Sequence, residues 1–435
     1  MTTTLNTNTR TVRRPAAARP IRLQADICVL GAGAAGISAA IEAARLGHRV
    51  LLVDGAPQLG GQATGAMVGT FCGFYSNGKQ PRLVTHGIAA EILRDLRASG
   101  DAHDIVGRRN TLIVQYRVVA LQRWIEEAVR RAGIDVVLGA VMRAAHRDGR
   151  RLARIELATR HGDVEIAARG FVDASGDAAL AWTAGLECRE AEAGPAFGTT
   201  MFTLEGFDAA GFARLDRAVL QARLKEKASA YGLKRHDGFL FSPPGSDEAL
   251  VNMTHIGTPL DPVGASRAVL EGRAQVDSLV AFLRAEFPDV FAKARVRTYA
   301  LPGIRQTRSI AGVHQLTADE VRRGVRFDDA VARCSWPIEY HYRADAVHWE
   351  EFGDDHMHYV PFRSLTPAEA DNIVAAGRCI DADPVALSSV RVMGPCIAMG
   401  AAAAHALDLA GAGSVHQIDI AELQRRLRKN LEDAG

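Results

Sequence analysis

Hydrophobic and polar positions alternate in blocks at residues 27–54, "ICVLGAGAAGISAAIEAARLGHRVLLVD". Four apolar residues, 27–30, end at a glycine, and a stretch rich in Ala, Ile and Glu begins almost at once. A second apolar run follows at residues 49–53. This pattern predicts a buried strand that turns tightly into a helix, followed by a second buried strand.

Three glycines and one aspartate in this unit have the spacing of a dinucleotide-binding fingerprint. Gly31 allows the tight turn, Gly33 lets the backbone approach a pyrophosphate, and Gly36 lets helix and strand pack closely. The free amides at the helix start attract phosphate, and Asp54 after the second strand can accept hydrogen bonds from a ribose. We therefore predict a dinucleotide site here, against the alternative of a glycine-tolerant turn without a ligand.

The pattern continues with a glycine-rich loop and further elements up to residue 178. Helical spacing predicts helices over about 85–98 and 116–132. Four short segments, "IDVVLG", "AVMRAAHRD", "LARIELATR" and "VEIAARGFVDASG", predict a meander of strands that ends in a small-residue turn.

The second half of the chain predicts an inserted lobe and a return to the first fold. Strand patterns such as "TTMFTLEGF" and a long helix at about 264–287 fall in a stretch of different composition, and Thr317 with Glu320 predicts a capping box. The expected division is: 1–24 disordered tail, 25–178 first part of the nucleotide-binding domain, 179–300 inserted lobe, 301–412 second part with substrate-facing loops, and 413–435 C-terminal helix.

Composition and charge narrow the class of protein. The 435 residues are 48% hydrophobic and 23% charged, as in ordinary globular proteins. Fifty-two basic and fifty acidic residues give a net charge of +2, so we expect neither a nucleic-acid partner nor an anionic membrane surface. No apolar run has the length of a membrane span. A small-molecule substrate and a possible homo-oligomer remain the expected partners.

The six cysteines and the N-terminal residues bear on location. The cysteines form no CxxC pair, which argues against dithiol, iron–sulfur and zinc-ribbon sites. The first residues lack the apolar stretch of a secretory signal. We therefore expect a cytoplasmic protein without a metal.

The order of motifs along the chain resembles a known family. "GGQAT" and "VDASGD" lie in the first half, and "RQTR" (305–308), "VPFRSLTP" (360–367), "DNIVAAGRC" (371–379) and "RVMGPCIAMGAAAA" (391–404) lie in the second. Over about residues 25–410 they resemble FAD-dependent oxidoreductases of the glutathione-reductase-like fold, in particular the family related to the fumarate reductase flavoprotein. The resemblance implies an α/β protein: a Rossmann-like FAD-binding domain with an inserted α+β substrate lobe.

The resemblance also implies which residues bind FAD. Arg391 and the helix near Gly394 would direct positive charge at the flavin N1–C2=O edge. Leu59 stands where flavoproteins with covalent FAD carry a histidine, so noncovalent binding is expected. The full set is Gly31, Gly33, Ala34, Ala35, Gly36, Asp54, Gly60, Gly61, Gln62, Ala63, Thr64, Val141, Ala174, Ser175, Gly176, Gly377, Arg378, Arg391, Gly394 and Cys396.

Candidate catalytic and substrate-binding residues are concentrated between positions 305 and 363. Glu339 and His341 match the family's acid-x-His pattern, and an imidazole titrates near neutral pH. Structural pairing is the alternative for each candidate. We expect His341, Glu339 and Arg305 to be catalytic, and Arg308, Arg363 and His255 to bind substrate, His255 standing where relatives carry an arginine.

The expected activity is that of an FAD-dependent dehydrogenase or oxidase that moves a hydride between a small polar metabolite and flavin N5. No second dinucleotide fingerprint is present, which argues against a separate NAD(P)H domain. Two alternatives stay open: a reductase of an activated C=C bond, and a non-enzymatic escort protein of the same fold.

Overall fold

The structure, a computed structural model, describes residues 9–13, 19–107, 111–192, 194, 196–242 and 246–432. Residues 1–8 and 14–18 of the predicted tail and residues 433–435 of the predicted C-terminal segment lie outside this range. The tail was predicted to reach residue 24, but strand β1 already begins at Ile21, because Ile21 pairs with Val164.

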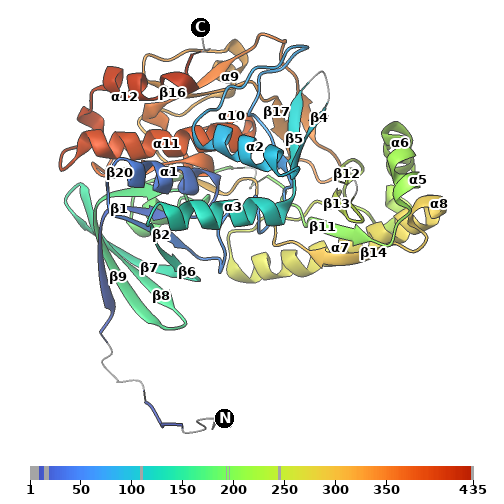
Figure 1. Ribbon diagram of the computed structural model, residues 1–435, viewed down its shortest axis with the longest axis horizontal. Coiled ribbons are helices and arrows are strands. Elements are labelled where there is room, and N and C mark those ends of the chain that lie inside the picture. Colours follow the sequence, from blue (N-terminus) through green and yellow to red (C-terminus); the bar gives the residue numbers. More distant parts are fainter. Residues whose placement is uncertain are drawn as a thin grey trace, which may run out of the picture.

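A seven-stranded sheet forms the centre of the part of the fold that was predicted to bind a nucleotide (Figure 1). Its order is β6-β2-β1-β9-β8-β7, and β20 also pairs with β9. The parallel strands are β1 (Ile21–Leu30), β2 (Val50–Asp54), β6 (Asp135–Leu138), β9 (Gly162–Asp173) and β20 (Ile373–Ala375). The antiparallel strands are β7 (Val141–Asp148) and β8 (Arg151–Thr159).

The predicted strand–helix–strand unit is confirmed as β1, α1 (Ala34–Arg45) and β2. The predicted meander was wrong in one strand. "IDVVLG" forms β6, which pairs in parallel with β2 at the sheet edge, whereas β7, β8 and β9 form the meander. The sequence of a short apolar strand does not indicate which strand it will pair with. Only the tertiary structure therefore distinguishes a strand of the meander from an edge strand beside β2.

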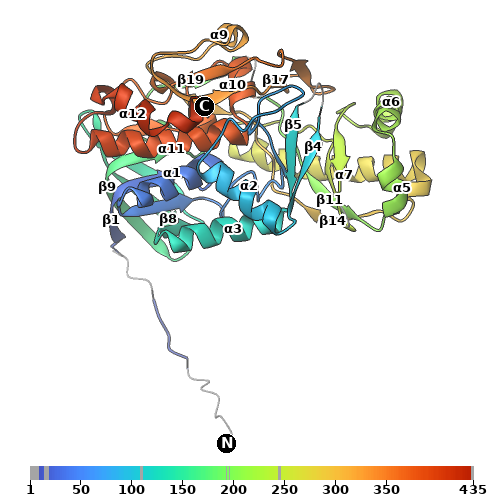
Figure 2. The same cartoon turned by 45° about the horizontal axis from the view of Figure 1, so that its top comes forward.

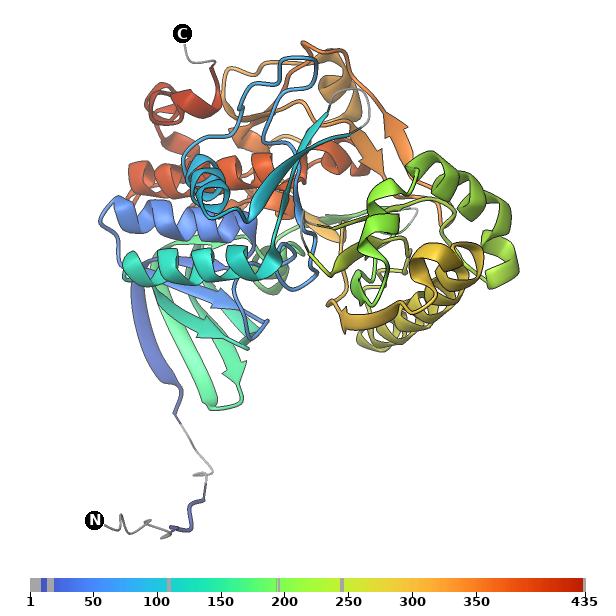
Figure 3. The ribbon, with the colours of Figure 1, turned by 45° about the vertical axis from the view of Figure 1, so that its right-hand side comes forward.

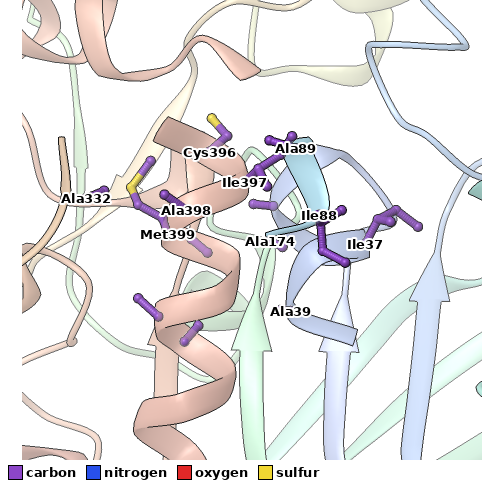
Figure 4. Packing of buried hydrophobic residues seen from close by; sticks show 14 of the residues in the cluster. Ile37, Ala39, Ile88, Ala89, Ala174, Ala332, Cys396, Ile397, Ala398 and Met399 are labelled. Atoms are coloured by element: carbon purple, nitrogen blue, oxygen red, sulfur yellow. The ribbon is translucent and has the colours of Figure 1, made fainter. Parts of the chain in front are cut away.

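The helices on this sheet share one apolar core. α2 (Ile88–Ala98), α3 (Val118–Arg131) and α11 (Met393–Ala410) agree with the predicted helical segments. Figure 4 shows buried residues of this core, among them Ile397 of α11, Ile37 of α1 and Ile88 of α2. The core thus joins segments that lie 360 residues apart, as Ile37 and Ile397 do.

Among the described residues, one helix is long and apolar enough to cross a membrane by these two criteria alone. It is α11, and 67% of its 18 residues are buried inside the fold.

A separate four-stranded sheet lies in the lobe (Figure 3). Its order is β12-β13-β11-β14, and its own apolar cluster includes Phe202, Leu279 and Phe291. The strands are β11 (Phe202–Glu205), β12 (Phe239–Phe241), β13 (Ala249–Asn252) and β14 (Arg295–Tyr299). The helices are α5 (Ala209–Arg214), α6 (Arg217–Lys227), η2 (Ala228–Tyr231), α7 (Pro262–Glu286) and α8 (Pro288–Phe291).

The remaining elements come from both halves of the chain (Figure 2). The predicted capping box of Thr317 and Glu320 is confirmed at the start of α9. Strands pair as β3 (Thr70–Phe71)–β5 (Leu112–Tyr116)–β4 (Ala102–Val106), β10 (Cys188–Glu190)–β15 (Arg308–Ile310), β16 (Ala330–Cys334)–β19 (His358–Pro361) and β17 (Ile338–Tyr340)–β18 (His348–Glu350). The helices are α4 (Ala179–Thr183), α9 (Ala318–Arg323), η3 (Phe362–Ser364), η4 (Gly377–Cys379), α10 (Pro384–Val390), η5 (Val415–Gln417), α12 (Ile420–Arg426) and η6 (Arg428–Asn430).

Candidate functional site

A cavity of about 630 Å³ runs from the ends of β1 and β2 to the lobe. One end, which we call the cofactor end, is formed by the glycine-rich turns of the nucleotide-binding part. The other, the substrate end, lies between the lobe and strands β17 and β18. Predicted cofactor residues that line the cavity are Gly33, Ala34, Ala35, Asp54, Gly61, Gln62, Ala63, Ala174, Ser175, Gly176, Gly377, Arg378, Arg391 and Cys396.

Gly33 stands at the start of α1 and leaves open space in front of it. A Cβ built on Gly33 meets no heavy atom of the described chain within 4 Å, and its backbone has φ −79° and ψ −172°. The amide of Ile37 donates to the oxygen of Gly33, so the amides of Ala34, Ala35 and Gly36 lie in the first turn, where a helix leaves its amides available to a ligand. This opening suits a pyrophosphate at a helix N-terminus.

Four predicted residues shape the turns without lining the cavity. A Cβ on Gly31 would lie 2.2 Å from the oxygen of Ala174, and one on Gly36 would lie 1.7 Å from the oxygen of Gly31. Gly60 has φ +101°, and Gly394 donates its amide to the oxygen of Cys72 over 3.0 Å. These glycines allow close backbone packing, which places the cavity-lining segments.

Two other predicted contacts lie away from the cavity. Thr64 is buried and donates its hydroxyl to the oxygen of Leu59 over 2.6 Å. Val141 is 64% exposed at the start of β7, and the cavity wall nearby is formed instead by Ala56. The structure therefore does not bring Val141 or Thr64 into the site.

The lining residues fit a dinucleotide chemically. Asp54 accepts the amides of Ala32 and Ala56 over 2.5 and 2.7 Å, which holds its carboxylate at the cavity wall. Arg378 has its Nη1 buried without a hydrogen-bond partner among the described residues, and the nearest oxygen of Asp177 lies 3.8 Å away. A buried guanidinium nitrogen without a partner is costly, and a phosphate oxygen would satisfy it.

Arg391, nearer the substrate end, also has a buried guanidinium nitrogen without a hydrogen-bond partner among the described residues. Its Nη2 donates to the backbone oxygen of Glu339 over 3.1 Å, while its Nε is buried without a partner among the residues described. Burial lowers the pKa of Arg391. Since Arg391 precedes α11, its charge and the helix N-terminus act at the same place, as expected for the flavin ring edge.

The substrate end has an excess of positive charge. Four arginines, Arg217, Arg235, Arg305 and Arg391, line it against two carboxylates, those of Asp237 and Glu339. Arg305 is 8% exposed and donates Nη1 to the oxygen of Phe197 over 2.8 Å. Burial, with Arg235 nearby, lowers the pKa of Arg305 well below its usual range. A negatively charged ligand would offset this repulsion and desolvation.

Glu339 faces the substrate end, and His341 lies behind it. His341 is 1% exposed, and its Nε2 lies 3.0 Å from Oε1 of Glu339. The indole Nε1 of Trp336 donates to the second carboxyl oxygen over 3.2 Å. Burial and the nearby Arg305 lower the pKa of His341 well below its usual value. The side chain that a substrate can touch is therefore Glu339, and not His341 as predicted.

His255 also lies behind the cavity wall instead of at its surface. It is fully buried, with Nε2 2.9 Å from Nδ1 of His341 and Nδ1 2.8 Å from the oxygen of Ala344. Burial lowers the pKa of His255 to about 2. Direct substrate binding by His255 is thus not supported by its position.

The structure does not place Arg308 or Arg363, which were predicted to bind substrate, at the cavity. Arg308 donates to Glu190 over 2.8 Å and lies 4.0 Å above the Trp182 ring. Arg363 donates to both carboxylate oxygens of Asp329. Neither side chain lines the cavity, because each has an acidic partner contributed by a distant segment.

Several lining residues were not predicted. Arg217, Arg235, Asn252 and Trp349 all line the substrate end. The only local signal was the polar run "KRHD" directly before the aromatic strand β12.

The described part of the chain holds no cluster of three or more His, Cys, Asp or Glu residues suited to a metal. His356 and His358, which could suggest one, form a pair in which His356 is half-buried and His358 is buried. Their facing nitrogens, Nε2 and Nδ1, are 3.2 Å apart, and Nε2 of His358 lies 2.9 Å from Oγ of Ser389. Burial lowers the pKa of His358 to about 3.

The lowered pKa of His358 predicts acid sensitivity of the fold. As the pH falls below about 6.5, the unfolded chain takes up this proton while the folded chain does not until about pH 3. Stability is therefore complete above pH 6.5 and decreases below it, by about 2 kcal/mol between pH 7 and pH 5 for this one group. We expect His358→Gln to reduce that decrease by about this amount in denaturant titrations at the two pH values. An equal decrease in the variant and the original protein would contradict this assignment.

Comparison with known proteins agrees with the site. The model of the family described as FAD dependent oxidoreductase matches residues 26–427, so this chain belongs to that family. It is an enzyme that uses FAD, as predicted, and the escort alternative is dropped. No curated protein matches the chain.

Three solved structures show a distant likeness to this chain. A geranylgeranyl bacteriochlorophyll reductase-like protein from Thermoplasma acidophilum is 13% identical with a TM-score of 0.49, over 94% of this chain and 86% of that one. The aromatic hydroxylase CabE from angucycline biosynthesis is 13% identical with a TM-score of 0.47, over 93% and 68%. The flavin-dependent brominase Bmp2 is 14% identical with a TM-score of 0.44, over 93% and 83%.

Proposed function

We propose that this enzyme moves a hydride between a small anionic metabolite and noncovalently bound FAD. FAD, when bound, supplies the hydride acceptor or donor at flavin N5. Arg305 and Arg235 hold the anion, and Glu339 exchanges the accompanying proton with the substrate. The observation that carries the proposal is the excess of arginine over carboxylate at the substrate end, where Arg235 and Arg305 are buried.

The charge balance explains why an anion is favoured. Arg235 is 3% exposed and is paired with Asp237 and Asn252, so it is held rigidly at the cavity wall. Among the described residues, Arg305 has one hydrogen-bond partner, the carbonyl oxygen that accepts from Nη1. Its Nε and Nη2 are therefore left for a ligand. Guanidinium groups bind carboxylates in bidentate geometry, and desolvation strengthens that attraction.

The proposal also covers the fold type, the cellular location and the oligomeric state. We propose the glutathione-reductase type of FAD-binding domain, with the lobe around β11–β14 as the substrate-binding insertion, and relatedness to the fumarate reductase flavoprotein. The parallel sheet with its antiparallel meander and the "GGQAT" and "GRC" turns at the cavity support this. A cytoplasmic enzyme, with a possible homo-oligomeric state, is part of the same proposal.

Reduction of an activated C=C bond is the second candidate. It is favoured by the placement of Glu339 beside Arg305 and Arg391. The two arginines would bind a substrate carboxylate next to the double bond, and the side chain of Glu339 would supply a proton to that bond. Dehydrogenation uses the same groups in reverse.

Anaerobic titration of the yellow, FAD-loaded protein with a panel of metabolites tests the proposal. We expect carboxylate-bearing hydroxy or amino acids to bleach the flavin absorbance, or fumarate-like acids to reoxidise dithionite-reduced protein, while neutral analogues do neither. Arg305→Gln should raise the concentration for half-maximal effect by about 30-fold or more. The matched control, Arg308→Gln, should change it by no more than about twofold. A response to neutral metabolites alone, or equal effects of the two variants, would refute the anionic substrate.

A further inference from the structure

Three side chains form a line behind the substrate end of the cavity. His255 and His341 are 0% and 1% exposed, and they connect the backbone oxygen of Ala344 to Oε1 of Glu339. The three distances along this line are 2.8, 2.9 and 3.0 Å. We call His255, His341 and Glu339 the relay.

The far end of the relay determines the direction of its hydrogen bonds. The oxygen of Ala344 can only accept, so Nδ1 of His255 carries a hydrogen. A neutral imidazole with a hydrogen on Nδ1 has a lone pair on Nε2, and burial keeps His255 neutral. Nδ1 of His341 must therefore donate to His255.

A count of hydrogens then leaves one proton to place. Three hydrogen bonds join the four groups, so three hydrogens are needed, and two neutral imidazoles supply only two. If Glu339 were ionised and His341 neutral, two lone pairs would face each other over 3.0 Å. The third hydrogen therefore belongs on the bond between Nε2 of His341 and Oε1 of Glu339.

We propose that the relay holds this one additional proton and that Glu339 delivers it to the substrate. The inference rests on the proposed function for the identity of the acceptor. In the step, the O–H bond of Glu339 breaks, a bond from hydrogen to a substrate atom forms, and the electron pair stays on the carboxylate. Glu339 is the catalytic residue, whereas His341 and His255 are positioning residues.

The charged groups around the relay act differently on its two ends. Arg305, Arg235 and Arg391 face His341, and they disfavour a full positive charge on its ring. Arg391 and Arg305 also face Glu339 and stabilise the carboxylate that forms when the proton leaves. The thiol of Cys72 lies near Glu339, and burial raises its pKa, so it remains neutral.

Spectroscopy of the FAD-loaded protein without substrate tests the proton count. Infrared difference spectra against Glu339→Gln and nitrogen-15 spectra of the histidines are recorded at neutral pH. We expect a protonated carboxyl band for Glu339 or an imidazolium signal for His341, with hydrogen on Nδ1 of both rings. A carboxylate at Glu339 together with two neutral imidazoles would overturn the proposal.

Two substitutions of His255 separate its hydrogen-bonding role from packing. Glutamine offers one donor and one acceptor, as a neutral imidazole does, so His255→Gln should keep the additional proton. His255→Phe fills the space beside Phe197 but offers neither, so His341 can turn its hydrogen toward an ionised Glu339. We expect the pH at which the relay loses its proton to fall by at least about one unit in His255→Phe only. Equal values in both variants would overturn the positioning role.

These outcomes are distinguishable from failure of the proposed function. The spectra that test the proton count are recorded without substrate. Their result is therefore independent of whether any metabolite bleaches the flavin. The spectra of the original protein decide the matter even if a variant does not fold.

Discussion

Glu339→Gln is expected to lower kcat/KM by about 10²- to 10⁴-fold while FAD binding stays unchanged. Glutamine has the shape of glutamate and can still accept the hydrogen bond from Nε1 of Trp336. It cannot release or take up a proton at neutral pH, so only the proton transfer is removed. Steady-state kinetics on an identified substrate, with flavin content from absorbance, gives both quantities.

The matched control for this variant lies on the neighbouring strand. Glu350 is on β18, which pairs with β17, and its carboxylate binds Arg322 away from the cavity. Glu350→Gln should therefore change kcat/KM by no more than about twofold. If Glu339→Gln retained full activity, Glu339 would not be the acid–base group.

Gly33→Ala and Gly36→Ala are both expected to weaken FAD binding, but only Gly36→Ala is expected to destabilise the FAD-free protein. A Cβ on Gly33 meets nothing within 4 Å in the described chain and protrudes into the cavity, so FAD affinity should fall by about 10- to 100-fold with little change in the stability of the FAD-free protein. A Cβ on Gly36 would lie 1.7 Å from the oxygen of Gly31, so Gly36→Ala should also lower the free energy of unfolding by about 3 kcal/mol.

The measurement compares denaturant unfolding of the FAD-free proteins with flavin binding followed by fluorescence. Loss of stability in Gly33→Ala as large as that in Gly36→Ala would show that Gly33 serves packing rather than the cofactor. Unchanged FAD affinity in Gly33→Ala would place the pyrophosphate elsewhere.

The cofactor end could be predicted well because its signals are local. Gly33, Asp54 and Gly61 lie in turns whose geometry follows from neighbouring residues, and all three line the cavity. The prediction failed where a residue's surroundings come from elsewhere in the chain. Val141 begins an expected strand but faces outward, and β6 pairs with β2 instead of joining the meander.

The substrate end shows the same difference more sharply. Arg305 was predicted to be catalytic, and Arg308 and Arg363 were predicted to bind substrate. Glu190 and Asp329 neutralise the last two, whereas Arg305 alone reaches the cavity. The residues next to an arginine in the sequence do not show which acidic side chain, if any, will form an ion pair with it in the folded protein.

The sequence alone predicts a nucleotide site in a strand–helix–strand unit and membership in a family of FAD-dependent enzymes. Both predictions depend on the spacing of nearby glycines and on the order of motifs along the chain. Only the folded chain decides which charges meet the substrate. His255 and His341 are 86 residues apart yet share a hydrogen bond, and Arg235 approaches Arg305 from the loop before β12. Hydrogen-bond direction and charge excess depend on distances between remote segments, and those distances exist only after the lobe and the central sheet have packed together.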